Sequence, residues 1–525
     1  MVIEDVCRHT APGASIRRTL LALLVVGGTI MLTLSYKPTE AATTFTVTET
    51  GDGDDINLNN ARCDSSTATG DQCTLRAAIQ EANDTSGADP IEFAIGGGAT
   101  NNIISPDSAL PTITDAVTID GYTQQGASPS TLEEGNDADL RILLDGNDAG
   151  SVVPGLEIDA PECTIRGLVI RNFDDFGISI LGDENNTVEG NFIGVGRDGV
   201  TPRGNFAGVF VQGESMVVGG TEPEARNVIS GNEETGVFIG TVAEDNRVEG
   251  NYIGTTADGT ADLGNLINGV FIVGESNTIG GTAPGPRNVI SGNDGSGVYL
   301  SSTVATENRI EGNFIGTRAE GTGALGNTED GVSINGGAHF NIVGGATSGT
   351  GNRIAHNGGD GVSISNSSSN GNILFRNSMF SNGGLGIDLS GGAEDANGVT
   401  DNDTDDPDTG PNNLQNFPVI RSAVRSSATG DTTISGRLNS NPAQLFEVQC
   451  FLTNGAPASA HGEGRRLLDT EIVSTGAGGN ARFSCVSSLT KLGQVSDQTV
   501  TATATNLLTF DTSEFANNKA ISTGP

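Results

Sequence analysis

Four aspartates in one short segment are the residues of this chain best suited to bind a metal ion. Asp401, Asp403, Asp405 and Asp408 lie close together in the sequence, ahead of Gly410. Ca²⁺ prefers clustered carboxylates of this kind, because it takes several hard oxygen ligands. Without water or a cation between them, such carboxylates would repel one another. The segment lacks the bidentate Glu of an EF-hand, so it is interpreted either as a calcium-binding loop or as a solvated acidic linker.

Two smaller acidic groups are further candidates. Asp52, Asp54 and Asp55, in "GDGDDINLNN", form a weaker calcium candidate. Asp174 and Asp175 are adjacent, and paired carboxylates serve as acid and base in glycoside hydrolysis. Neighbouring residues of a strand face opposite sides, so these two could act together only at a turn. The sequence contains no credible nucleophile elbow, phosphate-binding loop or dinucleotide fingerprint.

The composition predicts short strands around a core of small aliphatic residues. The 525 residues include 76 Gly and no Trp, and only 4% are aromatic. Packing must therefore rely on Val, Ile and Leu, in strands joined by Gly and Asn turns. The formal net charge of −39 disfavours nucleic acid and anionic membranes as partners, because both require a basic surface.

A twenty-residue repeat dominates the middle of the chain. Its copies begin at Asn186, Asn246 and Asn308, and "NRVEGNYIGTTADGTADLGN" is the second of them. Repeats of this kind indicate a solenoid. The loop in the middle of each copy carries an acid followed by Gly, and this pair favours a tight turn over a binding site. The three acids are Asp198, Asp258 and Glu320.

The strand motif Gly-Val-x-Ile/Val/Leu recurs about every thirty residues and predicts how the coils stack. Strands this short are not stable as isolated hairpins, but each can pair in parallel with its copy in the next coil. We therefore expect an all-β fold built on a right-handed parallel β-helix. The predicted strands are Val209–Val211, Val237–Ile239, Val270–Ile272, Val298–Leu300, Val332–Ile334 and Val362–Ile364. Recurring turn asparagines should form stacked amide ladders; they are Asn191, Asn251, Asn313, Asn232, Asn293 and Asn357.

The N-terminus indicates export. Arg17 and Arg18 precede the apolar run 20–34, and small residues follow, so residues 1–41 are predicted to be a signal peptide. No second run of membrane length follows. Export permits disulfides, expected between Cys63 and Cys73 and between Cys450 and Cys485. The remaining Cys163 lies in a strand-like segment and is expected to be a buried thiol.

The segment "CTLRAAIQEAN", residues 73–83, predicts an amphipathic helix with Leu75, Ala78, Ile79 and Ala82 on one face. Such a helix could cap the open end of a β-helix. The segment resembles the CSLREA-type motif of bacterial exported proteins, with Thr74 in place of Ser and Ala77 in place of Glu. "IRGLVIRNF" and "NVISGN" are similar to the repeats that follow this motif. The resemblance implies an exported or surface β-helix and no defined catalytic activity.

The predicted organisation is a signal peptide (1–41), an N-terminal cap with the first coils (42–150), β-helix repeats (151–392), an acidic linker (393–418) and an immunoglobulin-like β-sandwich (419–525). The first functional hypothesis is a secreted or cell-surface, non-enzymatic structural or adhesion module with a polysaccharide or cell-surface glycan as partner. The alternative is a carbohydrate-active enzyme, a polysaccharide lyase or glycoside hydrolase, on the same scaffold.

Overall fold

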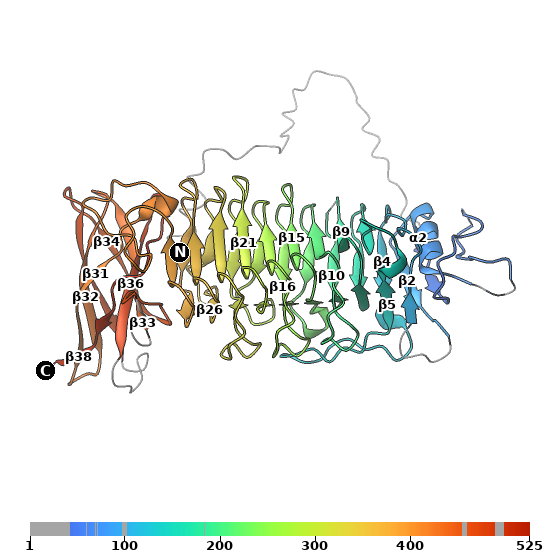
Figure 1. Ribbon diagram of the computed structural model, residues 1–525, viewed down its shortest axis with the longest axis horizontal. Coiled ribbons are helices and arrows are strands. Elements are labelled where there is room, and N and C mark those ends of the chain that lie inside the picture. Colours follow the sequence, from blue (N-terminus) through green and yellow to red (C-terminus); the bar gives the residue numbers. More distant parts are fainter. Residues whose placement is uncertain are drawn as a thin grey trace, which may run out of the picture. The chain divides into compact units, whose positions relative to one another are not determined.

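The computed structural model describes residues 42–525, apart from positions 59, 69, 71, 97–101, 183, 454–458, 489–497 and 525, so the predicted signal peptide lies outside the described residues. Short strands are stacked coil upon coil into three parallel sheets (Figure 1), which confirms the predicted parallel β-helix. From Val117 onward each coil contributes one strand to each sheet, because the coil passes through the three sheets in turn. The earlier coils supply the additional strands of the first and second sheets.

The first sheet has eleven strands. In spatial order they are β1 (Phe45–Val47), β2 (Asp89–Phe93), β4 (Val117–Asp120), β7 (Thr164–Arg166), β10 (Thr187–Glu189), β13 (Val217–Gly219), β16 (Arg247–Glu249), β19 (Thr278–Gly280), β22 (Arg309–Glu311), β25 (Ile342–Gly344) and β28 (Ile373–Phe375). The second sheet has ten strands. They are β3 (Asn102–Ile104), β5 (Ile142–Asp145), β8 (Leu168–Arg171), β11 (Phe192–Ile193), β14 (Val228–Ile229), β17 (Tyr252–Ile253), β20 (Val289–Ile290), β23 (Phe314–Ile315), β26 (Arg353–Ala355) and β29 (Ser378–Phe380).

The third sheet has nine strands and contains all six of the strands predicted from the Gly-Val-x motif. They are β6 (Leu156–Ile158), β9 (Phe176–Ile180), β12 (Ala207–Val211), β15 (Val237–Ile239), β18 (Val270–Ile272), β21 (Val298–Ser301), β24 (Val332–Asn335), β27 (Val362–Ile364) and β30 (Ile387–Leu389). The Val and Ile or Leu residues of each motif point into the core, and the residue between them faces outward.

The predicted helix covers the N-terminal end of the coils, as Figure 1 shows for α2 (Leu75–Asp84). Thr74 begins it, because its hydroxyl accepts a hydrogen bond from the N–H of Ala77. The apolar face of the helix joins the same core cluster as the first strands. The predicted Cys63–Cys73 disulfide is present beside the start of the helix. The helix therefore closes a sheet end that would otherwise expose its core. The described residues also form 3₁₀ turns: η1 (Gly121–Thr123), η2 (Gly146–Asp148), η3 (Pro223–Ala225) and η4 (Pro411–Leu414).

Asparagine side chains form three columns through the coils, which confirms the predicted ladders. In each column, the side-chain carbonyl of one Asn accepts hydrogen bonds from the backbone N–H, the side-chain amide, or both, of the Asn one coil earlier. All but the last residue of the third column are buried. The columns are 246, 277, 308, 341, 372 and 412; 191, 227, 251, 288, 313, 352 and 377; and 205, 232, 265, 293, 327, 357 and 382.

The C-terminal part is the predicted β-sandwich. One sheet consists of β35 (Asn480–Ser487), β32 (Thr432–Asn439), β31 (Val419–Ser426) and β38 (Ser522–Gly524). The other consists of β34 (Arg466–Ser474), β33 (Leu445–Thr453), β36 (Thr499–Asn506) and β37 (Lys519–Ala520). The predicted Cys450–Cys485 disulfide joins β33 to β35 and so links the two sheets.

Residues 393–418 were expected to be a linker, but the second half of this segment is folded against its neighbours. Leu414 is 3% exposed and belongs to the β-helix core cluster. Asn412 supplies the last member of one asparagine column by accepting a hydrogen bond from the N–H of Asn372. Packing against the last coil therefore orders a segment whose acidic composition suggested solvation.

Removing one ladder amide should destabilise the whole stack. Asn288→Ala would leave the buried N–H of Asn251 without its acceptor and would remove the side-chain hydrogen bond to the carbonyl of Val248. A buried group left unpaired costs about 1–3 kcal/mol. We expect a clearly lower denaturation midpoint in urea, followed by circular dichroism. Asn397→Ala, which removes an exposed amide outside the ladders, should leave the midpoint unchanged. Equal midpoints for both variants would contradict a stabilising role for the ladder.

Candidate functional site

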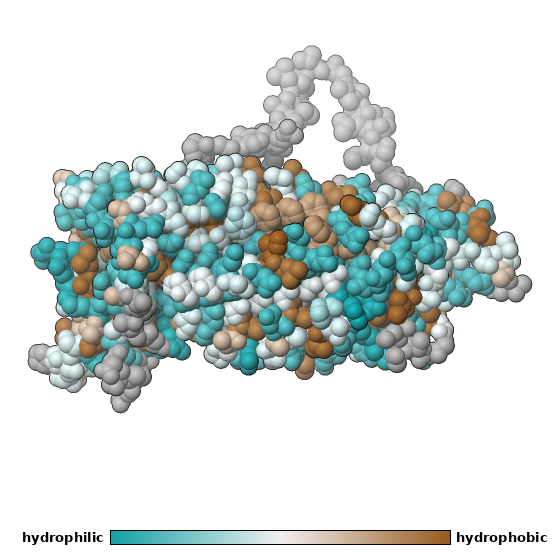
Figure 2. All heavy atoms as spheres, in the orientation of Figure 1, coloured by the Kyte–Doolittle hydropathy of each residue, from teal (hydrophilic) through white to brown (hydrophobic). Residues whose placement is uncertain are grey.

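An aromatic row runs along the outer face of the third sheet. Phe210, Phe238, Phe271 and Tyr299 occupy the outward position of β12, β15, β18 and β21, and each is the register partner of the next. Their ring centroids lie 5.3, 5.0 and 5.3 Å apart, and Phe176 adds a ring 4.9 Å from Phe210. All five are partly exposed. Figure 2 shows hydrophobic residues gathered over the strands between β9 and β21. We call these five residues the aromatic row.

The second sheet shows that an apolar outer face need not remain uncovered. Its outward residues Leu143, Val169, Phe192 and Val228 are at most 2% exposed. Loops enclose them and form a separate apolar cluster with Leu140, Val195 and Ala257. The aromatic row has no such cover among the described residues, so the two faces differ in what they offer to a ligand.

The twenty-residue repeats supply much of that cover, and their acids stabilise turns, as predicted. The loops stack on one another, since the N–H of Ala257 donates to Gly199 and that of Ala319 donates to Gly259. Asp198 accepts hydrogen bonds from the backbone N–H groups of Val200 and Thr201. Burial raises the pKa of Asp198, but these bonds and one from the Thr201 hydroxyl lower it by more, so the net pKa is below its ordinary value.

The other two acids repeat this arrangement. Asp258 accepts from the N–H of Thr260 at 3.0 Å and from the hydroxyl of Thr256 at 2.6 Å. Glu320 accepts from the N–H of Gly323 at 2.8 Å. The carboxylate of each acid therefore accepts hydrogen bonds from residues of its own loop.

Beyond Tyr299 the outward column changes from aromatic to small and acidic. The next register partners are Ser333, Ser363 and Asp388, one on each following strand. The two serine hydroxyls lie 3.0 Å apart. Ring contacts of Tyr299 among the described residues are with Phe271 alone, so the side of its ring toward Ser333 has no aromatic neighbour.

Two further carboxylates stand beside these serines, in the turns that lead into β24 and β27. Asp330 accepts from the hydroxyl of Ser363 at 2.6 Å and from the N–H of Asp360 at 2.8 Å. Burial, together with the charges of Asp388 and Asp330, raises the pKa of Asp360 to about 7. The pKa of Asp388 is also raised, chiefly by burial. A carboxyl group whose pKa is near 7 is partly protonated at neutral pH and can donate its proton. An ordinary surface Asp is ionised at that pH and cannot.

The acidic segment brings together three carboxylates, and two of them were predicted. Ligand atoms of Asp403, Asp406 and Asp408 all lie within 4.8 Å of one another, in what we call the acidic trio. Asp406 is 6% exposed and accepts from Gln415, Ser440 and the N–H of Asn416. One oxygen each of Asp403 and Asp408 is buried without a hydrogen-bond partner. Burial and the two neighbouring carboxylates raise the pKa of Asp406 to about 7.

Asp401 and Asp405 lie outside this group. Asp401 is exposed, and Asp405 turns its carboxylate toward the side chain of Asn439 at 3.3 Å. The trio therefore contains Asp406, which the sequence analysis did not select, in place of these two.

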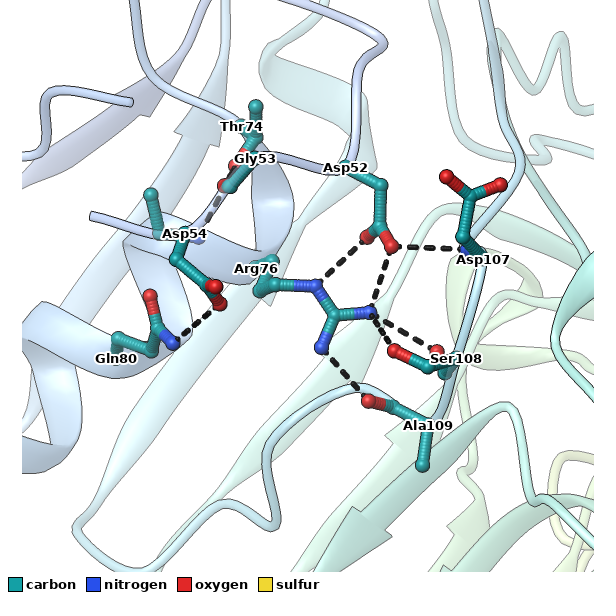
Figure 3. Close-up of polar contacts among 10 residues, drawn as sticks. Asp52, Gly53, Asp54, Thr74, Arg76, Gln80, Asp107, Ser108 and Ala109 are labelled. Atoms are coloured by element: carbon teal, nitrogen blue, oxygen red, sulfur yellow. Dashed lines mark hydrogen bonds and ion pairs between the residues drawn. The ribbon is translucent and has the colours of Figure 1, made fainter. Parts of the chain in front are cut away.

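Asp52, Asp54 and Asp55, the weaker calcium candidate, each bind a different partner (Figure 3). Asp52 pairs with Arg76 of α2 at 2.8 Å, and both side chains are 9% exposed. Arg76 also donates to the backbone carbonyls of Ser108 and Ala109. Asp54 accepts from Gln80 at 2.8 Å. The carboxylate of Asp55 accepts from the backbone N–H groups of Asn57 and Asp64 within the loop. Asp52 and Asp54 therefore anchor the N-terminal loop to the helix, and the three acids bond to separate partners.

Asp174 and Asp175 lie in the turn between β8 and β9, at the N-terminal end of the aromatic row. Asp174 is exposed, and the carbonyl of Asp175 accepts from the N–H of Phe206. Cys163 is a free thiol that is fully buried, as predicted, and burial raises its pKa to about 11. Such a thiol is not reactive.

No protein-family model matches this chain, and no curated protein matches it. Among solved structures, it is similar to full-length tailspike protein 2 of an Escherichia coli O157:H7 bacteriophage, with 12% identity over 89% of this chain and 68% of that one and a TM-score of 0.29. A second structure, the enzymatically active domain of bacteriophage CBA120 tailspike protein 2, has 12% identity over 89% and 76% of the chains and a TM-score of 0.26. Likenesses this weak assign no function. None of the described helices has the length and apolar character needed to cross a membrane.

Proposed function

We propose that this protein is an exported β-helix module that binds a glycan along the outer face of its third sheet. The observation that carries the proposal is the aromatic row, in which four rings lie in register and a fifth, Phe176, stacks on Phe210. All five rings are partly exposed, and no loop among the described residues encloses them. Ligand sites combine apolar and aromatic surface with a few polar groups that set orientation. Here the register partners that follow Tyr299 are Ser333, Ser363 and Asp388. Their hydroxyl and carboxylate groups could form hydrogen bonds with sugar hydroxyls.

Export is supported by the predicted signal peptide at residues 1–41 and by the two disulfides, which persist in oxidising compartments. The resemblance to CSLREA-type exported proteins agrees with this location. A rigid stack of coils would hold the binding face at a fixed geometry, as a surface or adhesion module requires.

Glycan binding is tested with the purified protein on a glycan array, followed by titration of the best ligand. Tyr299→Ala and Phe271→Ala should each weaken binding about tenfold, equivalent to about 1.4 kcal/mol, because buried aromatic contacts dominate such sites. Phe314→Ala is the matched control, since Phe314 is a partly exposed outward ring of the second sheet, beneath Arg287 and Arg353. A loss of affinity in the control equal to that in the row would overturn the assignment.

Glycan cleavage is a second candidate, favoured by the raised pKa of Asp360 beside Asp388 and Asp330. If the bound glycan is cleaved, a protonated Asp360 would serve as the acid, and Asp360→Asn should abolish product release while binding persists. Asp174→Asn combined with Asp175→Asn should retain the activity, because these acids lie at the opposite end of the row. Chromatography of the products checks both, and unchanged release by Asp360→Asn would reject this site.

The acidic trio is proposed to hold a structural Ca²⁺. Support comes from the short separation of its carboxylates and from the two buried oxygens that have no partner. Asp403, Asp406 and Asp408 would supply the ligands, because hard carboxylate oxygens suit this ion. The ion would tie the acidic segment to the sandwich, since Asp406 already bonds Ser440.

Calcium dependence should vary with pH. Because the pKa of Asp406 in the folded state is raised to about 7, its contribution to stability is present below the ordinary pKa and is lost as pH rises through 7. Without Ca²⁺ the melting temperature should therefore fall from pH 5 to pH 8. Ca²⁺ at about 100 times its Kd should restore about 2.7 kcal/mol at pH 8 and little at pH 5. Scanning calorimetry with EDTA or Ca²⁺ checks this, with Asp403→Asn expected to lose the effect and the exposed Asp401→Asn to keep it.

A further inference from the structure

A column of glutamates borders the aromatic row on the side where the chain leaves the third sheet. Glu214, Glu244 and Glu275 pair with one another as isolated parallel bridges in successive coils. Strands joined in this way lie about 4.8 Å apart, so the three carboxylates recur at the same spacing as the aromatic rings. Glu214 and Glu275 are exposed, and Glu244 is partly exposed. We call these three residues the glutamate column.

Among the described residues of the third sheet and of the turns that leave it, no Lys or Arg balances the charge of this column. The nine strands of the third sheet contain no Lys or Arg, nor do the turns 212–216, 240–246, 273–277 and 302–308 that leave it. Arg247 and Arg309, which follow the turns 240–246 and 302–308, belong to the first sheet and face Glu249 and Glu311 at 3.4 and 3.3 Å. Burial and the charges of Glu275, Asp245, Glu214 and Glu307 raise the pKa of Glu244. Like charges in register on neighbouring strands repel one another. The third sheet therefore carries the aromatic row and, beside it, a glutamate column whose negative charge no neighbouring Lys or Arg neutralises.

Resting on the glycan-binding function above, we propose that the ligand of this face is a cationic glycan, a linear polymer of amino sugars with free amino groups. Its axis would follow the stacking direction, so that sugar rings pack on the aromatic row while ammonium groups meet the glutamate column. One carboxylate per coil matches a ligand with a positive charge at regular intervals. Uronic acid polymers and sulfated glycans would be repelled by the same carboxylates.

The experiment compares three oligosaccharide probes by calorimetry at mildly acidic pH: β-linked glucosamine oligomers, their fully N-acetylated forms and oligogalacturonates. The first two share a backbone and differ only in charge. We expect glucosamine oligomers to bind at least about tenfold more tightly than the acetylated form, with an advantage that shrinks in high salt because the charges are exposed. Glu214→Gln combined with Glu275→Gln should remove most of this advantage and leave affinity for the acetylated oligomer unchanged.

The matched control is Glu222→Gln combined with Glu224→Gln, two exposed acids in and beside the turn η3 between the first and second sheets. This control removes the same net charge and should keep the preference for glucosamine. Equal binding of the charged and acetylated oligomers, or preference for oligogalacturonate, would overturn the cationic assignment and leave glycan binding intact. Binding of none of the probes, with none on the array, would overturn both. Polylysine binding that survives Phe271→Ala, without glucosamine binding, would show simple ion exchange and also reject the proposal.

Discussion

The hydrogen bond between one asparagine and the asparagine of the next coil is the constraint on which the β-helix depends. Asn251 shows the geometry: its N–H and its side-chain amide both donate to the side-chain carbonyl of Asn288, at 2.9 and 3.1 Å. The same amide donates to the carbonyl of Val218 one coil earlier. A chain that inserted one residue into a strand between two columns would break such contacts at buried positions, where unpaired groups are costly. The columns therefore fix the register of every strand between them.

A fixed register explains how short strands can carry an ordered outer surface. The outward ring follows the third-column asparagine by five residues in β12 and by six in β15, β18 and β21. Because the column fixes that asparagine in every coil, the four rings fall into one line. The ends of the ladders also define what can terminate the stack. Asn382 meets the carboxylate of Glu463 from the sandwich, which accepts from both its N–H and its side-chain amide. Glu463 thus replaces the asparagine of a missing coil, and the sandwich caps the stack by continuing its hydrogen bonding.

The sequence was sufficient to predict the strands and the ladders because both recur at fixed intervals, and repetition makes each copy evidence for the others. It was insufficient for the acidic trio. Asp401, Asp403, Asp405 and Asp408 were selected from their spacing in the sequence alone. In the fold, Asp405 and Asp406 adopt φ of 66° and 58°, a left-handed bend that turns Asp405 toward Asn439 and Asp406 into the trio. Composition offers no sign of such a bend, since it depends on packing against the sandwich.

The sequence also did not identify the aromatic row as a site, although four of its five residues occupy the variable position of the predicted strand motif. What singles it out is a comparison of three outer faces that only the fold allows. The first sheet presents polar and charged residues such as Thr187, Arg247 and Thr278. The second sheet presents apolar residues and covers them with the repeated loops. The third presents apolar rings and leaves them partly exposed. Long loops therefore enclose the apolar face of the second sheet, whereas only short turns border the aromatic row of the third. This difference leaves the rings of the third sheet accessible to a ligand.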